Sequence, residues 1–354
     1  MQSAHLDFET CSDLDLKQVG VFAYAEHPST RILCMSYAFK GEEPVTWFPG
    51  MALSQSLLAW ITNSGKLAAW NAQFERVIWE MIAVPRHGFP RVYPYQWYNP
   101  QALAMSRNLP ASLDGTAAAL GNAQRKDKEG KRLMQRMARG LDLTPANLTR
   151  LGTYCAQDVR TETEADTKLG HAWEERERVI YRVSERINHR GIAIDLDFVR
   201  KAAKAVEDYQ HHVAHQMQST FGVAPTQVQR IQALCLSRYR VALPDLRADT
   251  VDEVLAAPEF YPDEMLALLR MRQQAAAVSV RKYPAMLRAV CFDERIRGMF
   301  SYSGAGQTRR WSARIVQPHN LPRPTLPYAV TRAAMEALRA SGRWEDLLPF
   351  GDPL

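Results

Sequence analysis

The sequence predicts an α/β domain, built on a mixed sheet flanked by helices, that is followed by a mainly helical domain. In the first half, short apolar runs with strand character alternate with amphipathic helical patterns, which is typical of an α/β domain. After about Leu169 the composition changes to long, charged helical segments. With 354 residues, of which 46% are hydrophobic, the chain is long enough for roughly two domains with their own cores.

Composition narrows the classes of protein. The formal net charge of +6 is a basic excess compatible with a polyanionic partner. The five cysteines are widely spaced and include no Cys-x-x-Cys pair, so we expect free thiols in a reducing compartment rather than a zinc site or disulfides. No run approaches the roughly 20 apolar residues of a membrane helix, and the N-terminus lacks the features of a signal peptide. We therefore expect no membrane partner and a cytoplasmic location, in the host cytoplasm if the protein is viral.

The first predicted strand contains the pentad Leu6–Thr10, which reads Leu-Asp-Phe-Glu-Thr. Further strands are predicted over Ile32–Phe39 and Pro44–Phe48, and Leu67–Trp70 is a brief apolar run that ends at Asn71. Helices are predicted over Ser54–Thr62, Ala72–Ala83 and Pro145–Lys168, with Ser112 as the cap of a helix that opens at Pro110.

Two acids of the pentad are the first candidate site residues. Successive side chains of a strand point to opposite faces, so Asp7 and Glu9 project from the same side of the sheet. Two carboxylates that lie next to each other on one face repel each other unless a positive charge lies between them. Magnesium or manganese suits such hard oxygen ligands. The alternative is that both acids face water on an edge strand.

Two more acidic motifs follow in the chain. Asn71 and Glu75 lie at the start of a predicted helix, and Glu75 is one residue off its apolar face, where it could point back over the sheet edge. Tyr154 and Asp158 are four residues apart and hence on one face of a helix. Such a pair is also a common structural arrangement, in which a nearby Asp caps a buried Tyr.

Basic residues gather in the stretch Gln124–Arg139, which holds seven Lys or Arg against two acids. It is either a solvated helix face or a phosphate-facing rim beside a carboxylate site.

The second half is predicted to be mainly helical. Helices are expected over His171–His189, Asp197–Phe221, Thr226–Leu236, Thr250–Ala257 and Pro262–Leu287, the last being the longest, and strands over Ile192–Ile194 and Arg297–Ser301. His211 and His215 could share a metal at their four-residue spacing, but no third ligand is evident, so we expect a solvated face.

An arginine-rich segment follows the last predicted strand. Residues 303–323 combine glycines, hydroxyls, amides and four arginines. These arginines are Arg309, Arg310, Arg314 and Arg323. Such side chains suit contacts with phosphate and sugar, although a plain surface loop is the alternative.

The three acidic motifs, in their order, resemble those of the DEDD exonuclease superfamily in its tyrosine-bearing subclass. More closely, they are similar to the proofreading 3′→5′ exonuclease domain of family A (DNA polymerase I-like, bacteriophage-type) DNA polymerases. The likeness extends to Leu120-Gly121, to Lys126–Gly130 and to the run Tyr154–Glu162. The second half resembles the thumb of these polymerases, and the arginine-rich segment resembles the Thr-Gly-Arg-Trp-Ser…Gln-Asn-Leu-Pro segment at the palm entrance.

Three positions depart from the pattern of this family. Glu75 stands where Asp is usual, which puts the strength of a second metal site in doubt. Arg309 stands where the first glycine of the palm segment is usual, and Ala313 replaces another small residue, so the backbone turns there could differ.

The resemblance implies a ribonuclease H-like exonuclease domain over residues 1–170, a helical thumb-like DNA-binding region over 171–292 and an incomplete palm over 293–354. It implies two divalent metal ions, Mg²⁺ or Mn²⁺, and release of 5′-mononucleotides from the 3′ end of single-stranded DNA, with primer-template DNA as a further partner. By resemblance Asp7 bridges both ions, Glu9 and Asp158 complete one, Glu75 holds the other through water, and Tyr154 orients the attacking water. The implied DNA contacts are Asn71, Thr10, Arg309, Arg310, Arg314, Gln317 and Asn320.

A family A polymerase also needs two palm aspartates and a fingers helix, and the sequence ends at Leu354 before either. We therefore expect the N-terminal portion of a polymerase, either truncated or one half of a split enzyme. Two hypotheses remain open: an active exonuclease, or a DNA-binding scaffold with weak or no nuclease activity whose palm and fingers come from a second chain. An RNA-trimming enzyme of the same superfamily fits the acids but not the second half.

Overall fold

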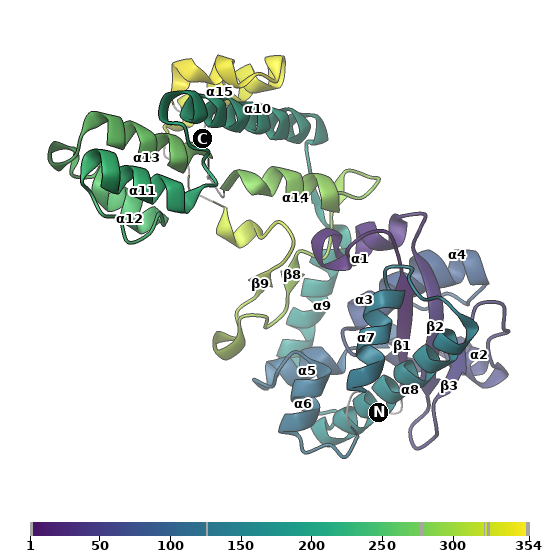
Figure 1. Ribbon diagram of the computed structural model, residues 1–354. Coiled ribbons are helices and arrows are strands. Elements are labelled where there is room, and N and C mark those ends of the chain that lie inside the picture. The colour runs from purple at the N-terminus through teal and green to yellow at the C-terminus, as the bar shows by residue number, and fades with distance from the viewer. Residues whose placement is uncertain (1–2, 125–126, 276–278, 322, 324–325, 352–354) are drawn as a thin grey trace. The chain divides into compact units, whose positions relative to one another are not determined.

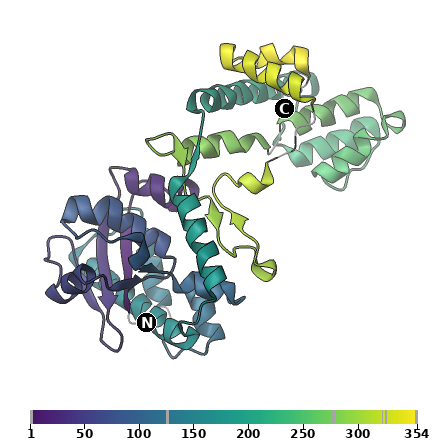
Figure 2. The same ribbon diagram turned by 180° about the vertical axis from the view of Figure 1, so that it is seen from behind.

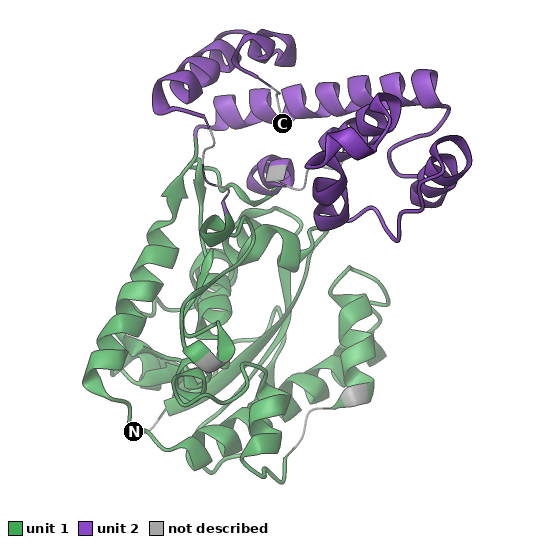
Figure 3. Ribbon diagram, turned by 90° about the vertical axis from the view of Figure 1, so that its left-hand side faces the viewer, with its two compact units in different colours: residues 1–194, 288–320 green, residues 195–287, 321–354 purple. Residues whose placement is uncertain are grey.

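The computed structural model describes residues 3–124, 127–275, 279–321, 323 and 326–351. The chain divides into two compact units, one formed by residues 1–194 and 288–320 and the other by residues 195–287 and 321–354 (Figure 3). These limits differ from the expected domain boundaries at residues 170 and 292. The reason is pairing between segments that are distant in the chain: β6 (Ile192–Ala193) pairs antiparallel with β7 (Arg295–Ile296). The buried Asn188 also donates to the Phe300 carbonyl (2.7 Å) and accepts from its N–H (2.9 Å).

A five-stranded mixed sheet forms the centre of the first unit (Figures 1 and 2). Its strands are β1 (Ser3–Cys11), β2 (Arg31–Ala38), β3 (Val45–Trp47), β4 (Lys66–Ala68) and β5 (Trp97–Tyr98). The order is β3-β2-β1-β4-β5, in which β2 runs antiparallel to β1 and β3, whereas β4 runs parallel to β1 and β5. This arrangement confirms the mixed sheet flanked by helices that the sequence predicts.

Helices cover both faces of the sheet (Figures 1 and 2). The helices and turns between residues 16 and 190 are α1 (Leu16–Glu26), α2 (Gln55–Thr62), α3 (Ala72–Ile78), the π-helical turn η1 (Trp79–Ala83), α4 (Val84–His87), the 3₁₀ turn η2 (Pro94–Gln96), α5 (Pro100–Ser106), α6 (Leu113–Ala119), α7 (Lys128–Met137), α8 (Pro145–Leu169) and α9 (Glu175–Arg190). The expected caps are present, since Ser54 accepts from the Leu57 N–H and Ser112 from the Gly115 N–H. The helix predicted over 72–83 ends in a π-turn, because Pro85 lacks the N–H that would bond to Met81.

The two faces of β1 have different partners. Ala4, Leu6 and Phe8 are fully or almost fully buried in a hydrophobic core that α1, α2, α3 and η1 complete. The odd-numbered residues point to the opposite face, where α8 crosses β1 and β2. Gly152 permits the close approach of α8, because an added Cβ would lie 2.8 Å from the Phe48 ring and 3.1 Å from Thr46. The crossing fixes which α8 residues face the strand.

Segment 295–320 completes the first unit. It contains β7, β8 (Phe300–Ser301), η5 (Gly306–Thr308), β9 (Ser312–Ala313) and η6 (Pro318–Asn320). The strand predicted over 297–301 is confirmed only in its last two residues, which form β8, while β7 precedes the predicted range and belongs to a different two-stranded sheet. Gly298 separates them with φ +69°, a left-handed conformation that breaks an extended run.

The second unit is helical where it is described. Its elements are α10 (Leu196–Phe221), α11 (Val228–Tyr239), α12 (Ala248–Leu255), η3 (Pro258–Phe260), α13 (Asp263–Ala275), η4 (Ser279–Arg281), α14 (Lys282–Ala289, ending in the first unit), α15 (Tyr328–Ser341) and η7 (Trp344–Phe350). α10 buries a residue every third or fourth position, from Val199 to Met217, and packs on α13 and α15.

One predicted helix of this unit is wrong. The helix expected over Pro262–Leu287 is divided into α13, η4 and α14, and residues 276–278 lie outside the described residues. Pro284 gives a reason for the division, because it cannot donate to the carbonyl of Val280 and its ring clashes with a continuous helix there.

All five cysteines are free thiols and buried, as expected. In the part of the chain that the structure describes, no helix combines the length and apolarity needed to cross a membrane.

Candidate active site

Two rows of side chains face each other where α8 crosses β1. The strand row consists of His5, Asp7 and Glu9, and the helix row of Tyr154, Asp158, Glu162 and Asp166. Two residues of a strand advance about 6.6 Å and four residues of a helix about 6.0 Å, so the rows stay in step over several residues. The strand therefore meets the helix at two successive clusters, one around Asp7 and Glu9 and one around His5.

The first cluster consists of three carboxylates. Asp7, Glu9 and Asp158 each present an oxygen atom, and these atoms all lie within 4.8 Å of one another. Glu9 and Asp158 are buried, while Asp7 keeps some exposure to solvent. Like charges this close repel strongly in a partly buried place, so the arrangement favours a bound cation. The structure thus brings together three of the four acids that the sequence singles out.

Tyr154 lies beside these acids and is buried. Burial raises the pKa of its hydroxyl, and the charges of Asp158, Glu9 and Asp7 raise it further. The backbone of α7 approaches Tyr154 at Gly130, where an added Cβ would lie 2.6 Å from the tyrosine ring and 2.7 Å from the Asp127 carboxylate. A glycine at this position therefore lets α7 cover Tyr154.

Replacing Gly130 with Ala is expected to destabilise the first unit by about 1–2 kcal/mol. Overpacking against the tyrosine ring costs about 1–3 kcal/mol and exceeds the gain of about 1 kcal/mol in helix propensity. Urea unfolding followed by tryptophan fluorescence measures the change. Glu129→Ala, at an exposed position of the same helix, is the control and should stay within about 0.5 kcal/mol. A Gly130→Ala variant as stable as the unmodified chain would contradict close packing.

Cys155 ties α8 to the strand at the first cluster. Its Sγ donates to the Asp7 carbonyl (3.2 Å) and lies 3.4 Å from the Asp7 Oδ2. Burial raises the pKa of this thiol, and its neighbours Cys34 and Asp7 add to the effect. The protonated thiol holds Asp7 in place.

The second cluster centres on His5, which is 3% exposed. Its Nδ1 lies 2.8 Å from Glu162 Oε1, and its Nε2 lies 3.3 Å from Asp166 Oδ2. Burial opposes the charged imidazolium, but the hydrogen bonds to Asp166 and Glu162 together outweigh it and raise the pKa of His5 to about 9. Tyr98 donates to Asp166 (2.7 Å), so the cluster also holds β5, which β4 separates from β1.

Glu162 links this cluster to the second acidic motif. Its Oε2 accepts from the Trp70 N–H at 2.8 Å, just before α3 begins. The next residue, Asn71, takes the left-handed conformation with φ +71° and starts α3. Glu75 follows on α3 and is 3% exposed, but its carboxylate is not part of the three-carboxylate group. The hydrogen bond from Trp70 to Glu162 therefore ties the start of α3, which carries Glu75, to the second cluster.

The other predicted contacts lie on separate elements. The hydroxyl groups of Thr10 and Tyr24, which lies on α1, share a hydrogen bond of 3.0 Å. Arg309 takes φ +54°, a conformation that glycine favours, and pairs with Glu177 of α9 at 3.3 Å. Arg314 donates to the Ser301 hydroxyl (2.9 Å).

Three predicted DNA contacts of the arginine-rich segment remain, namely Arg310, Gln317 and Asn320. Asn320 donates to the Gln317 side chain at 3.1 Å, and Arg310 is exposed. Residues 125 and 126 of the predicted basic stretch lie outside the described residues.

The site residues predicted from the sequence did not include His5, Glu162, Asp166 and Cys155. The signal was available, because His5 continues the odd-numbered row of Asp7 and Glu9. Glu162 and Asp166 likewise continue the four-residue spacing that Tyr154 and Asp158 begin.

Comparison with known proteins adds a relative in sequence and one in structure, while no protein-family model matches the chain. The chain is 32% identical over 343 residues to a DNA polymerase of Bacillus phage SP02, a match that covers 91% of this chain and 51% of the phage protein. Its fold is similar to the POL domain of Pol1 from M. smegmatis in complex with DNA primer-template and dNTP, with a TM-score of 0.56 and 15% identity over 92% of this chain and 53% of the other. The chain is therefore similar to a DNA polymerase in sequence and to a polymerase domain in fold, and it spans about half the length of each of these two proteins.

Proposed function

We propose that this chain is a metal-dependent 3′→5′ DNA exonuclease that releases 5′-mononucleotides and acts in DNA replication as the proofreading part of a DNA polymerase. The observation that carries the proposal is the group formed by Asp7, Glu9 and Asp158, whose oxygen atoms lie within 4.8 Å of one another. The similarity to a phage DNA polymerase supports DNA as the substrate and primer-template DNA as a partner.

The residues present fit a divalent cation. All three ligands are carboxylates, the hard donors that Mg²⁺ or Mn²⁺ takes, and their mutual repulsion is relieved when a cation is bound. Such an ion supplies positive charge that polarises a phosphate and lowers the pKa of water. Glu75, outside this group, is the candidate for holding a second ion through water.

The chain's own residues would bind and orient the substrate. Tyr154 lies beside the carboxylates, where its hydroxyl can orient the attacking water by a hydrogen bond. On α7, Lys131 and Arg132 directly follow Gly130, which packs on Tyr154, and both are exposed. These cations are placed to attract the phosphates of a strand whose 3′ end enters the site. Asn71 is the candidate contact to the terminal nucleotide.

Digestion of a 5′-labelled single-stranded DNA oligonucleotide tests the proposal. With Mg²⁺ or Mn²⁺ we expect a ladder that shortens from the 3′ end, and with EDTA we expect no product. An RNA oligonucleotide of the same sequence should be cut more slowly, and faster cleavage of RNA would favour an RNA-trimming enzyme. Binding of DNA without cleavage under either metal would overturn the proposal in favour of a DNA-binding scaffold.

A further inference from the structure

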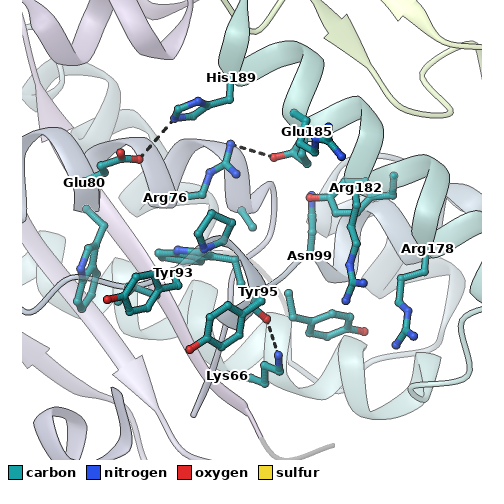
Figure 4. Close-up of a pocket in the computed structure, with 18 of the residues that line it drawn as sticks. Lys66, Arg76, Glu80, Tyr93, Tyr95, Asn99, Arg178, Arg182, Glu185 and His189 are labelled. Carbon is teal, nitrogen blue, oxygen red and sulfur yellow. Dashed lines mark hydrogen bonds and ion pairs between the residues drawn. The ribbon is translucent and has the colours of Figure 1, made fainter. Parts of the chain in front are cut away.

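A large pocket lies in the first unit, apart from the carboxylates. Its volume is about 1460 Å³, and its walls are α3 with η1, segment 91–99 and α9 (Figure 4). Among the described residues that line it there is none of Asp7, Glu9, Tyr154 and Asp158. The pocket is larger than the roughly 300–1,000 Å³ that small-molecule sites occupy, so it has room for a ligand larger than a typical small molecule.

The lining of the pocket is strongly basic. Seven Lys or Arg line it, namely Lys66, Arg76, Arg91, Arg178, Arg182, Arg186 and Arg190, and the acids that line it are Glu80 and Glu185. Both acids already have basic side chains as partners within the pocket, since Arg76 lies 3.3 Å from Glu185 and His189 lies 3.7 Å from Glu80 (Figure 4). Arg178 pairs with Glu175, which does not line the pocket. The other five cations, Lys66, Arg91, Arg182, Arg186 and Arg190, give the pocket an excess of positive charge that an anionic ligand would neutralise.

Lys66, Arg178 and Arg182 lie close together in the pocket. Burial lowers the pKa of the Lys66 ammonium, and the nearby charges of Arg182 and Arg178 lower it further. Arg178, Arg182 and Arg186 are spaced by four residues along α9, so they recur on one face about every 6 Å. A repeated row of guanidinium groups suits a chain of phosphates better than a single anion.

Aromatic rings stand across the pocket from this row. The rings of Tyr93 and Tyr95 are stacked, with centroids 5.8 Å apart and an angle of 7° between their planes. Both residues are more than half exposed, and the Lys66 ammonium lies 5.5 Å from the centroid of the Tyr95 ring. Figure 4 shows the two tyrosines on one side and Arg178 and Arg182 on the other. Exposed flat rings beside cations form a stacking platform for nucleic-acid bases.

We propose that this pocket binds a short segment of single-stranded nucleic acid, with its phosphates along Arg178, Arg182 and Arg186 and a base stacked on Tyr95. An acidic protein segment would neutralise the arginines but would leave the stacked tyrosines without a function, so the combination favours nucleic acid. The inference goes beyond the exonuclease proposal, because binding here requires neither the carboxylates nor a metal.

Fluorescence anisotropy with the full chain tests the inference. The probe is a fluorescein-labelled single-stranded DNA of about 12 nucleotides, titrated in EDTA at several salt concentrations. Arg182→Glu with Arg186→Glu should weaken binding at least about tenfold. If both arginines contact phosphates, the slope of log K against log salt should become shallower by about 1.4. The matched control, Lys17→Glu with Arg288→Glu, changes the net charge equally at exposed residues outside the pocket and should retain affinity within about threefold.

Base stacking is tested separately with 2-aminopurine in the same oligonucleotide. Its fluorescence should be quenched on binding, and Tyr95→Ala should reduce the quenching and weaken binding at least about fivefold. Three results would each overturn the inference. They are an equal loss of affinity in the two double charge variants, an unchanged affinity in Arg182→Glu with Arg186→Glu, and no binding of DNA by the unmodified chain. Circular dichroism establishes that the variants are folded. Because EDTA prevents metal-dependent cleavage, the result does not depend on whether the exonuclease proposal is correct.

Discussion

Replacing Asp7 with Ala is expected to lower the rate of DNA cleavage by at least about 10³-fold. Asp7 is the most solvent-accessible of the three gathered carboxylates and would be one of the ligands of a bound cation. Losing one anionic ligand of such a site removes several kcal/mol of charge stabilisation in the transition state. Digestion of a 5′-labelled single-stranded oligonucleotide in Mg²⁺ measures the rate, and anisotropy measures DNA binding, which should remain near that of the unmodified chain.

The same variant separates chemistry from folding. Without metal, three crowded carboxylates repel one another, so Asp7→Ala should melt at the same temperature as the unmodified chain or higher in EDTA. Added Mn²⁺ should raise the melting temperature of the unmodified chain and leave that of the variant nearly unchanged. Asp13→Ala, an exposed acid just after β1, is the control and should behave as the unmodified chain in every assay. A parallel loss of DNA binding and cleavage in Asp7→Ala would contradict the expectation that Asp7 is needed for cleavage but not for binding of DNA.

Replacing His5 with Leu is expected to destabilise the first unit by about 3–5 kcal/mol. The change leaves the buried Glu162 and Asp166 carboxylates without the imidazolium that bonds to both. Removing one partner of a buried ion pair costs about this much because the other charge remains buried. Guanidinium chloride unfolding followed by tryptophan fluorescence measures the effect. Adding Glu162→Gln to His5→Leu should recover part of the loss, whereas an additive double variant would exclude direct coupling.

The pH dependence of stability follows from the same histidine. The pKa of His5 rises from 6.5 to about 9 on folding, so its contribution to stability is complete below pH 6.5 and is lost as the pH rises through 9. In EDTA the free energy of unfolding should therefore fall more steeply between these pH values in the unmodified chain than in His5→Leu. His211→Ala, at an exposed position of α10, serves as the control and should keep the steeper fall. Identical pH profiles for the unmodified chain and His5→Leu would refute the assignment.

The parts of the site set by local periodicity could be predicted from the sequence. Alternation along β1 places Asp7 and Glu9 on one face, and four-residue spacing on α8 places Tyr154 and Asp158 on one face. That these two faces meet depends on Gly152, whose role is visible only once α8 lies over Phe48. The metal role of the acids stays a prediction.

Features that depend on distant partners could not be predicted. Glu162 bonds to the Trp70 N–H across 92 positions of the chain, and Asn188 bonds to Phe300 across 112. No local pattern encodes either pair, whereas the expected boundary at residue 170 depended on a local change of composition. The division of the helix predicted over 262–287 follows from Pro284, which the sequence does contain.

The matched rows of β1 and α8 also limit which insertions and deletions the gene can accept. One extra residue in α8 between Asp158 and Glu162 would rotate the following turns by about 100°, so that Asp158 and Glu162 could not both face the strand. Selection for folding alone therefore preserves the spacing of the carboxylates. A descendant that lost the carboxylates of the first cluster would be expected to keep His5, Glu162 and the distance between the two rows, so point mutations alone could restore the lost carboxylates to the same place.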